Sequence, residues 1–104
     1  MGIRNDAGEL LFYAYTRYQK GEQVSHTDLK AESGWDDSRL RNALKYLQEK
    51  GLVKATLFLG GNFFIDKVLP EGIDIVENEP EFKDTFGVSL NLGILQFSWK
   101  TEKK

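Results

Sequence analysis

The segment spanning residues 35–54, WDDSRLRNALKYLQEKGLVK, constrains the fold of this chain more than any other. Its apolar residues recur at steps of three and four, the spacing of a helix that buries one stripe: Leu40, Ala43, Leu44 and Leu47. Asp36 precedes the stripe as an N-cap residue, and Gly51 supplies the left-handed residue that commonly ends a helix. The sequence therefore predicts an amphipathic helix from Asp37 to Lys50 with a marked start and end.

A shorter helix is predicted immediately upstream. Ser25 and Asp28 have the spacing of a capping box, and they open a segment that carries Leu29 and runs into Gly34. A short helix, a glycine turn and a longer helix with a polar face form a helix-turn-helix. A further helix is predicted from about Asp6 to Lys20, where three tyrosines at helical spacing indicate packing more than ligand stacking.

The segments that follow the long helix are predicted to form a β-hairpin and then a further helix. Residues 52–59 and 63–68 have the pattern of two strands around Gly60-Gly61-Asn62, which tolerates the positive φ of a tight hairpin. Pro70 then fits the first turn of a helix in LPEGIDIVEN. In this order the chain resembles the winged helix-turn-helix family, including bacterial and archaeal regulators of the MarR type. The resemblance implies an α+β fold, a three-helix core with a β-hairpin wing, and a recognition helix that ends in the Leu-x-x-x-Gly-Leu-Val pattern of Leu47 to Val53. It also implies that Glu22-Gln23-Val24 is a short strand.

Composition favours one folded domain with an added C-terminal segment. The chain has 104 residues, 40% of them hydrophobic, which suits one modest core. We expect residues 1–78 to form the winged helix-turn-helix domain. Residues 79–104 are expected to form an acidic connector, within ENEPEFKD, followed by a C-terminal β-strand that begins near Val88. That strand presents Leu95, Phe97 and Trp99 on one side, so we expect either a homodimer through the strand or a strand that folds back on its own domain.

The absence of certain signals excludes several classes. There is no cysteine, so disulfides and thiolate chemistry are excluded, and no apolar run approaches the length of a bilayer span. We therefore expect a soluble, cytoplasmic protein. His26 is the only histidine and is expected on the surface of a first helical turn, where it lacks the convergent partners of a metal site. Asp36 and Asp37 are explained as a capping pair, and no Gly-rich phosphate loop is present. The sequence thus predicts no enzyme, no catalytic residues, no metal and no cofactor.

The distribution of charge along the chain bears on whether it binds nucleic acid. Residues 1–70 hold ten Lys or Arg and nine Asp or Glu, a net of +1, whereas residues 71–104 hold four and seven, a net of −3, giving the total of −2. Non-specific DNA affinity comes mostly from phosphate neutralisation, so this balance argues for weak or sequence-dependent binding. The expected tip of the wing carries no Lys or Arg, and only Lys54 and Lys67 lie near its base.

Two functions remain after these exclusions. The first is a DNA-binding transcriptional regulator that reads the major groove of double-stranded DNA with the helix from Asp37 to Lys50. Its candidate contacts are polar, cationic or aromatic side chains on or beside that helix: Ser38, Arg39, Arg41, Asn42, Lys45, Tyr46 and Lys54. Within this set we expect Arg39 on the exposed face and Arg41 on its flank. The alternative is a winged helix used as a protein-protein interaction module without DNA binding, which the acidic composition and the apolar wing favour.

Overall fold

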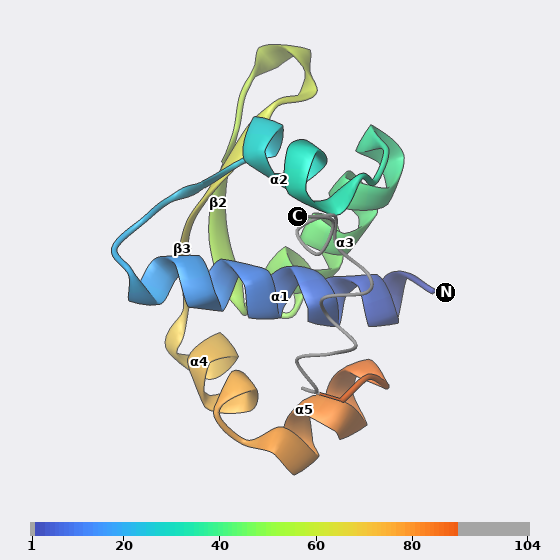
Figure 1. Ribbon diagram of the computed structural model, residues 1–104, viewed down its shortest axis with the longest axis vertical. Helices are drawn as coiled ribbons and strands as arrows, with labels where there is room; N and C mark the ends of the chain where they lie inside the picture. The colour runs from blue at the N-terminus through green and yellow to red at the C-terminus, as the bar shows by residue number, and fades with distance from the viewer. Residues whose placement is uncertain (1, 90–104) are drawn as a thin grey trace.

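The computed structural model of the chain describes residues 2–89, which form an α+β structure (Figure 1). Its elements follow the chain in the order α1 (Ile3–Gln19), β1 (Val24–Ser25), α2 (His26–Ser33), α3 (Asp37–Glu49), β2 (Val53–Leu57), a short 3-10 turn (Leu59–Gly61), β3 (Phe63–Val68), α4 (Pro70–Val76) and α5 (Glu79–Phe86). Within the described residues this amounts to five α-helices and one three-stranded antiparallel sheet. None of these helices is long and apolar enough to cross a membrane.

Helix α1 lies across the middle of the molecule. In Figure 1, α2 and α3 lie on one side of it and α4 and α5 on the other. Its buried face is built from small and branched side chains at helical spacing, namely Ala7, Leu10, Leu11 and Ala14. The helix begins at Ile3, three residues before the predicted start at Asp6, and the Asn5 side chain caps this end by accepting a hydrogen bond from the Gly2 amide at 3.3 Å.

The caps that the sequence predicts are present at both helices of the α2–α3 pair. The Ser25 hydroxyl accepts a hydrogen bond from the Asp28 amide at 3.1 Å, and the Asp36 carboxylate accepts one from the Arg39 amide at 2.9 Å. Gly34 ends α2 with φ +75°, and Gly51 follows α3 with the same φ, a conformation that costs a residue with a Cβ. The predicted apolar stripe of α3 is buried in full, which confirms the helical phase.

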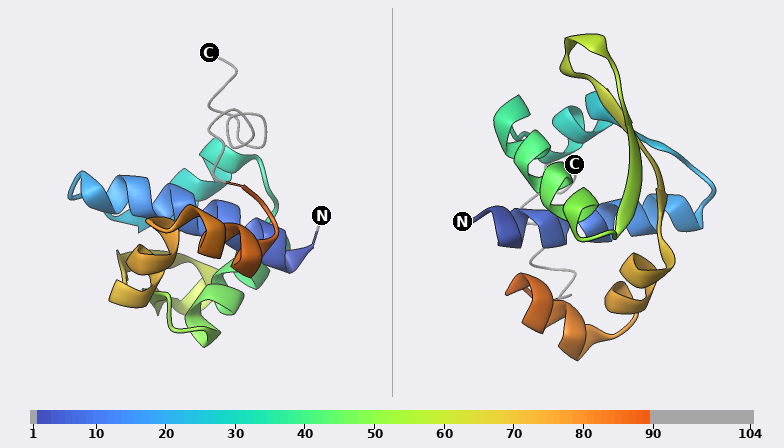
Figure 2. Two further views of the ribbon diagram at one scale, coloured as in Figure 1. Left: turned by 90° about the horizontal axis from the view of Figure 1, so that it is seen from below. Right: turned by 180° about the vertical axis from the view of Figure 1, so that it is seen from behind.

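The sheet has the strand order β1-β3-β2, so the first, short strand pairs with the last. Val24 pairs with Ile65, and the β2–β3 hairpin closes with Leu57 opposite Phe63. Gly60 and Gly61 at its tip have φ of +90° and +91°, as the sequence predicts for this turn. The hairpin extends past α2 at the end of the molecule opposite to α4 and α5 (Figures 1 and 2).

The predicted acidic connector is wrong, because most of it forms helix α5. Asn78 caps this helix by accepting a hydrogen bond from the Glu81 amide at 3.3 Å, and Pro80 stands in its first turn. Phe82 and Phe86 are fully buried and pack against the rest of the core. The acidic residues therefore occupy the exposed side of a core helix, where carboxylates in the first turn suit the helix dipole. The β-strand predicted beyond Val88, and the dimer contact expected from it, lie outside the described residues apart from Val88 and Ser89.

Candidate nucleic-acid interface

Helix α3 presents one continuous exposed face. The side chains of this face are exposed, and no other described residue covers them. They recur at steps of three and four residues: Ser38, Arg41, Asn42, Lys45 and Glu49. We call these five residues the α3 face. The first four are among the predicted site residues, so the structure brings those four together on one surface. Glu49 adds a carboxylate at the C-terminal end of the same surface.

Arg39 lies at the edge of this face: its side chain is 38% exposed and lines a surface groove with Ser38 and Asn42, but its guanidinium is held by another residue. Its guanidinium turns toward α1 and donates two hydrogen bonds to Asp6, from Nε to Oδ2 at 2.8 Å and from Nη2 to Oδ1 at 3.0 Å. It also lies over the Trp35 ring, 4.1 Å from the ring centroid. The hydrogen bonds to the Asp6 carboxylate are the main reason that the pKa of Arg39 is raised. The sequence predicts Arg39 on the exposed face, but it cannot show that α1 packs beside Arg39 and that Asp6 holds its guanidinium.

Tyr46 and Lys54 are also separate from the α3 face. Tyr46 is half-buried, its ring centroid lies 6.5 Å from that of Phe86 in α5, and the Lys50 ammonium lies 5.6 Å from its ring centroid. The Tyr46 ring therefore packs on the side of α3 that faces α5. Lys54 is exposed on β2 directly opposite Lys67 on β3, which places two like charges together at the base of the hairpin.

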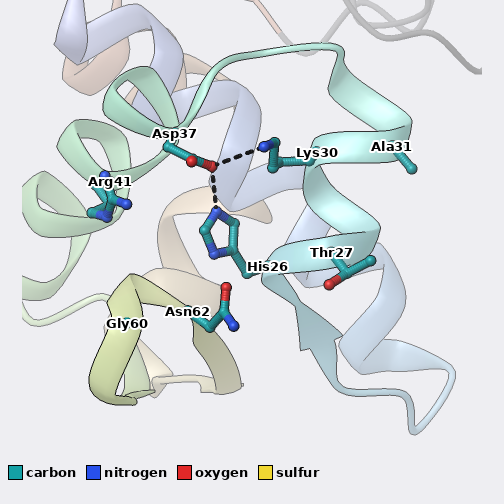
Figure 3. A pocket seen from close by; sticks show the side chains of 8 residues that line it. All are labelled: His26, Thr27, Lys30, Ala31, Asp37, Arg41, Gly60 and Asn62. Carbon is teal, nitrogen blue, oxygen red and sulfur yellow. Dashed lines mark hydrogen bonds and ion pairs between the residues drawn. The ribbon is translucent and has the colours of Figure 1, made fainter.

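A groove of about 490 Å³ lies beside the α3 face, between α2, the start of α3 and the tip of the hairpin (Figure 3). His26 and Lys30 come from α2, Asp37 and Arg41 from α3, and Asn62 from the hairpin. Thr27, Ala31 and Gly60 complete the lining. Segments that are far apart in the sequence thus supply one polar groove.

His26 is buried in the wall of this groove, whereas the sequence suggested a surface residue. Only 5% of it is exposed, its ring stacks on Phe63 with centroids 4.5 Å apart, and its Nε2 lies 3.0 Å from Oδ1 of Asp37. The Lys30 ammonium lies 3.2 Å from the same carboxylate oxygen. The hydrogen bond from Lys30 is the largest of the effects that lower the pKa of Asp37, and His26 adds to it. The other ring nitrogen, Nδ1, is buried and has no hydrogen-bond partner.

Arg41 closes the opposite wall of the groove. Its guanidinium lies so close to the hairpin tip that a Cβ on Gly61 would be only 2.8 Å from Nη2. Within the described part of the chain, Arg41 makes no hydrogen bond or ion pair. Sequence reasoning found Arg41 but missed the groove, since His26 and Asp37 are joined only by tertiary structure.

The tip of the hairpin is apolar and exposed. Leu57 and Phe58 are about half exposed, and Leu59 is fully exposed at 100%. Residues 57–62 include no Lys or Arg, as the sequence shows. This surface therefore suits apolar contact better than contact with phosphates.

Known proteins do not identify the chain: no family model, no curated protein and no solved structure matches it. Across residues 2–89 there is also no group of three or more His, Asp or Glu side chains arranged to hold a metal ion. The features of the chain that bear on its function are therefore the α3 face, the groove and the hairpin.

Proposed function

We propose that the protein is a winged helix-turn-helix regulator of transcription that binds duplex DNA in the cytoplasm. The order of helices and strands supports this proposal, because α2, the Gly34 turn and α3 have the succession of a helix-turn-helix and the β2–β3 hairpin follows as a wing. In this role α3 enters the major groove, whose width admits one α-helix.

The observation that carries the proposal is the α3 face. Arg41 and Asn42 stand there at adjacent positions, and Lys45 follows one turn later. Asparagine reads adenine edges, and arginine binds either a guanine edge or a backbone phosphate. The buried stripe on the opposite side fixes the helix against the core, so these side chains project from a rigid support. Ser38 at the start of the face suits a phosphate or base contact.

Local charge predicts modest affinity and a small salt slope. Arg41, Lys45 and Lys30 supply positive charge near the α3 face, but Glu49, Asp36 and Asp37 lie on the same helix or at its cap. Few phosphates can therefore be neutralised, and sequence-specific contacts must supply much of the binding free energy.

A matched pair of triple variants tests the proposal. Fluorescence anisotropy with a library of genomic duplexes at low salt identifies a bound sequence, and its affinity is compared for Arg41→Ala/Asn42→Ala/Lys45→Ala and for Lys20→Ala/Gln23→Ala/Lys83→Ala. Both sets remove the same charge from exposed positions. We expect the first set to weaken binding at least tenfold, because each base contact is worth about 1–3 kcal/mol, and the second to change it little. No binding by the wild type at low salt would exclude the proposal.

The apolar hairpin tip favours a second function, a protein-protein interaction module without DNA binding. Leu57, Phe58 and Leu59 form an exposed apolar surface on an element that projects from the molecule (Figure 2). Such surfaces commonly mark binding sites. Absence of DNA binding, together with a partner from a lysate that binds the wild type and is lost in Leu59→Ser, would favour this function.

A further inference from the structure

The groove between α2, α3 and the hairpin tip is lined by charged and polar side chains that DNA binding by the α3 face does not require. We propose that it binds an oxyanion of the phosphate type, and that binding takes up a proton at His26. We call it the oxyanion groove, defined by His26, Lys30, Asp37, Arg41 and Asn62. The groove can be tested without DNA, so the inference goes beyond the proposed function.

The charges of the groove leave one cation available. Lys30 and Arg41 stand on opposite walls, while the single carboxylate, Asp37, already interacts with Lys30 at 3.2 Å and with His26 at 3.0 Å. Arg41 is without a partner among the described residues. A guanidinium binds the oxygens of a phosphate with two parallel hydrogen bonds, and such charge-assisted bonds are stronger than neutral ones. An anion between the walls would therefore pair with Arg41 and share Lys30.

His26 supplies a second, independent feature. The Asp37 carboxylate only accepts hydrogen bonds, so the His26 Nε2 that faces it carries the hydrogen. In neutral His26 the buried Nδ1 is then an acceptor without a donor, which costs free energy. Protonation converts Nδ1 into a donor. Asp37 and a bound anion both favour this imidazolium, whereas Lys30 and Arg41 oppose it, and the hairpin contributes only the uncharged Asn62 and Phe63.

Asn62 connects the buried ring to the ligand. In Figure 3 its amide oxygen points toward the His26 ring and its amide nitrogen points away. Nδ1 has no hydrogen-bond partner in this structure, and a protonated Nδ1–H would gain one if the exposed Asn62 side chain moved closer, which would leave the amide N–H groups for an anion. Neutral His26 instead favours the reversed amide, whose oxygen would face and repel the anion. Proton uptake and anion binding therefore support each other.

The oxyanion has two sources, a phosphodiester of nucleic acid or a free phosphate ester. The groove adjoins the α3 face through Arg41, so a DNA backbone beside a bound α3 would reach it. That assignment of the ligand rests on the proposed function, whereas the groove itself does not.

The test is an NMR titration of the ¹⁵N-labelled full chain with sodium sulfate, against sodium chloride at matched ionic strength. Sulfate keeps its charge across the range in which histidine titrates, so a change of affinity with pH reports on the protein. We expect saturable shifts at Thr27, Lys30, Arg41 and Asn62, and about tenfold tighter binding at about pH 5.5 than at about pH 8.

Four variants separate the groove from general surface charge. Arg41→Gln should weaken sulfate binding about tenfold, whereas Lys83→Gln, which removes an exposed cation of α5 outside the groove, should leave it unchanged. His26→Gln and Asn62→Ala should both remove the pH dependence. Asn62 is exposed, so its variant keeps the fold even if the loss of the buried imidazole disturbs the packing on Phe63.

Any one of three results would overturn the inference. Equal weakening by Arg41→Gln and Lys83→Gln would show that sulfate only screens the surface, and equal affinities of the wild type at the two pH values would exclude proton uptake at His26. Inorganic phosphate and the bound duplex are then titrated separately to identify the source. Shifts of the groove residues by the duplex indicate a phosphodiester, and shifts by phosphate alone indicate a free phosphate ester. DNA binding without sulfate binding would overturn this inference and leave the proposed function intact. Sulfate binding without DNA binding would support this inference and exclude the proposed function.

Discussion

The Arg39 guanidinium and the Asp6 carboxylate form a two-point ion pair between α3 and α1, with N–O distances of 2.8 and 3.0 Å. Asp6 is only 5% exposed, so its charge is removed from water and depends on this partner. The pair joins the first turn of α1 to the first turn of α3, and Trp35 covers it from the other side. Arg39 therefore stabilises the packing of α3 against α1.

Replacement of Arg39 by Ala should lower the free energy of unfolding by about 2–4 kcal/mol, because it leaves a buried carboxylate unpaired and uncovers Trp35. Arg41→Ala is the matched control. It removes the same side chain from an exposed position two residues away and should change stability by no more than about 0.5 kcal/mol. Urea denaturation measures both, and equal midpoints for the two variants would contradict the structural role of Arg39.

At Gly8, helix α1 approaches Phe86 of α5 closely. A Cβ at this position would lie 2.6 Å from the Cβ of Phe86, nearer than side chains normally approach. Gly8→Ala should therefore destabilise the protein by about 1–3 kcal/mol, although alanine favours helix by about 1 kcal/mol. Gly2→Ala is the control, since a Cβ there meets only the Asn5 side chain at 3.8 Å. A Gly8→Ala protein that melts above the wild type would show that α5 does not pack on α1 as described.

The packing of α5 on α1 is the part of the described fold that could not be predicted from the sequence. The caps at Ser25 and Asp36 join residues three apart, so their signals are local and were predicted correctly. The acidic segment before Phe86 also carries local signals, with Asn78 as its cap and Pro80 in its first turn, but it has too few apolar side chains for a clear helical period. Its helix is stabilised by contacts with residues some eighty positions earlier, including hydrogen bonds from Arg4 to the carbonyls of Asp84 and Thr85. Contacts of this kind leave no periodic signal.

The candidate site shows the same division. Periodicity found the exposed side of α3, and Ser38, Arg41, Asn42 and Lys45 do share one face. Periodicity could not decide between the two flanks, because the position of α1 is a tertiary property. The oxyanion groove was missed for the same reason, since its side chains come from three elements that meet only in the folded chain.

Asp37 should make stability depend on pH in the acid range. Its pKa is lowered in the folded state, first by the hydrogen bond from Lys30 and then by His26, so its contribution is present above the unfolded pKa of about 3.9. This contribution is lost as the pH falls through the lower, folded pKa. Urea midpoints measured from about pH 6 to about pH 2 should therefore fall more steeply for the wild type than for Asp37→Asn. Glu71→Gln, which alters an exposed carboxylate of α4, is the control and should follow the wild type. Parallel curves for the wild type and Asp37→Asn would show that the ion pairs of Asp37 do not contribute to folding.

The homodimer expected from the C-terminal sequence is tested by comparing the full chain with a chain that ends at Ser89. Residues 2–89 bury their own core, whereas the pattern of the sequence that follows predicts a strand with Leu95, Phe97 and Trp99 on one side. A two-fold dimer through that segment would also supply two copies of α3 for a palindromic DNA site. We expect the full chain to sediment as a dimer at high micromolar concentration and the shortened chain as a folded monomer. A full chain that sediments as a monomer would exclude the dimer, and a shortened chain that remains a dimer would place the interface within residues 2–89, with the apolar tip at Leu59 as the first surface to alter.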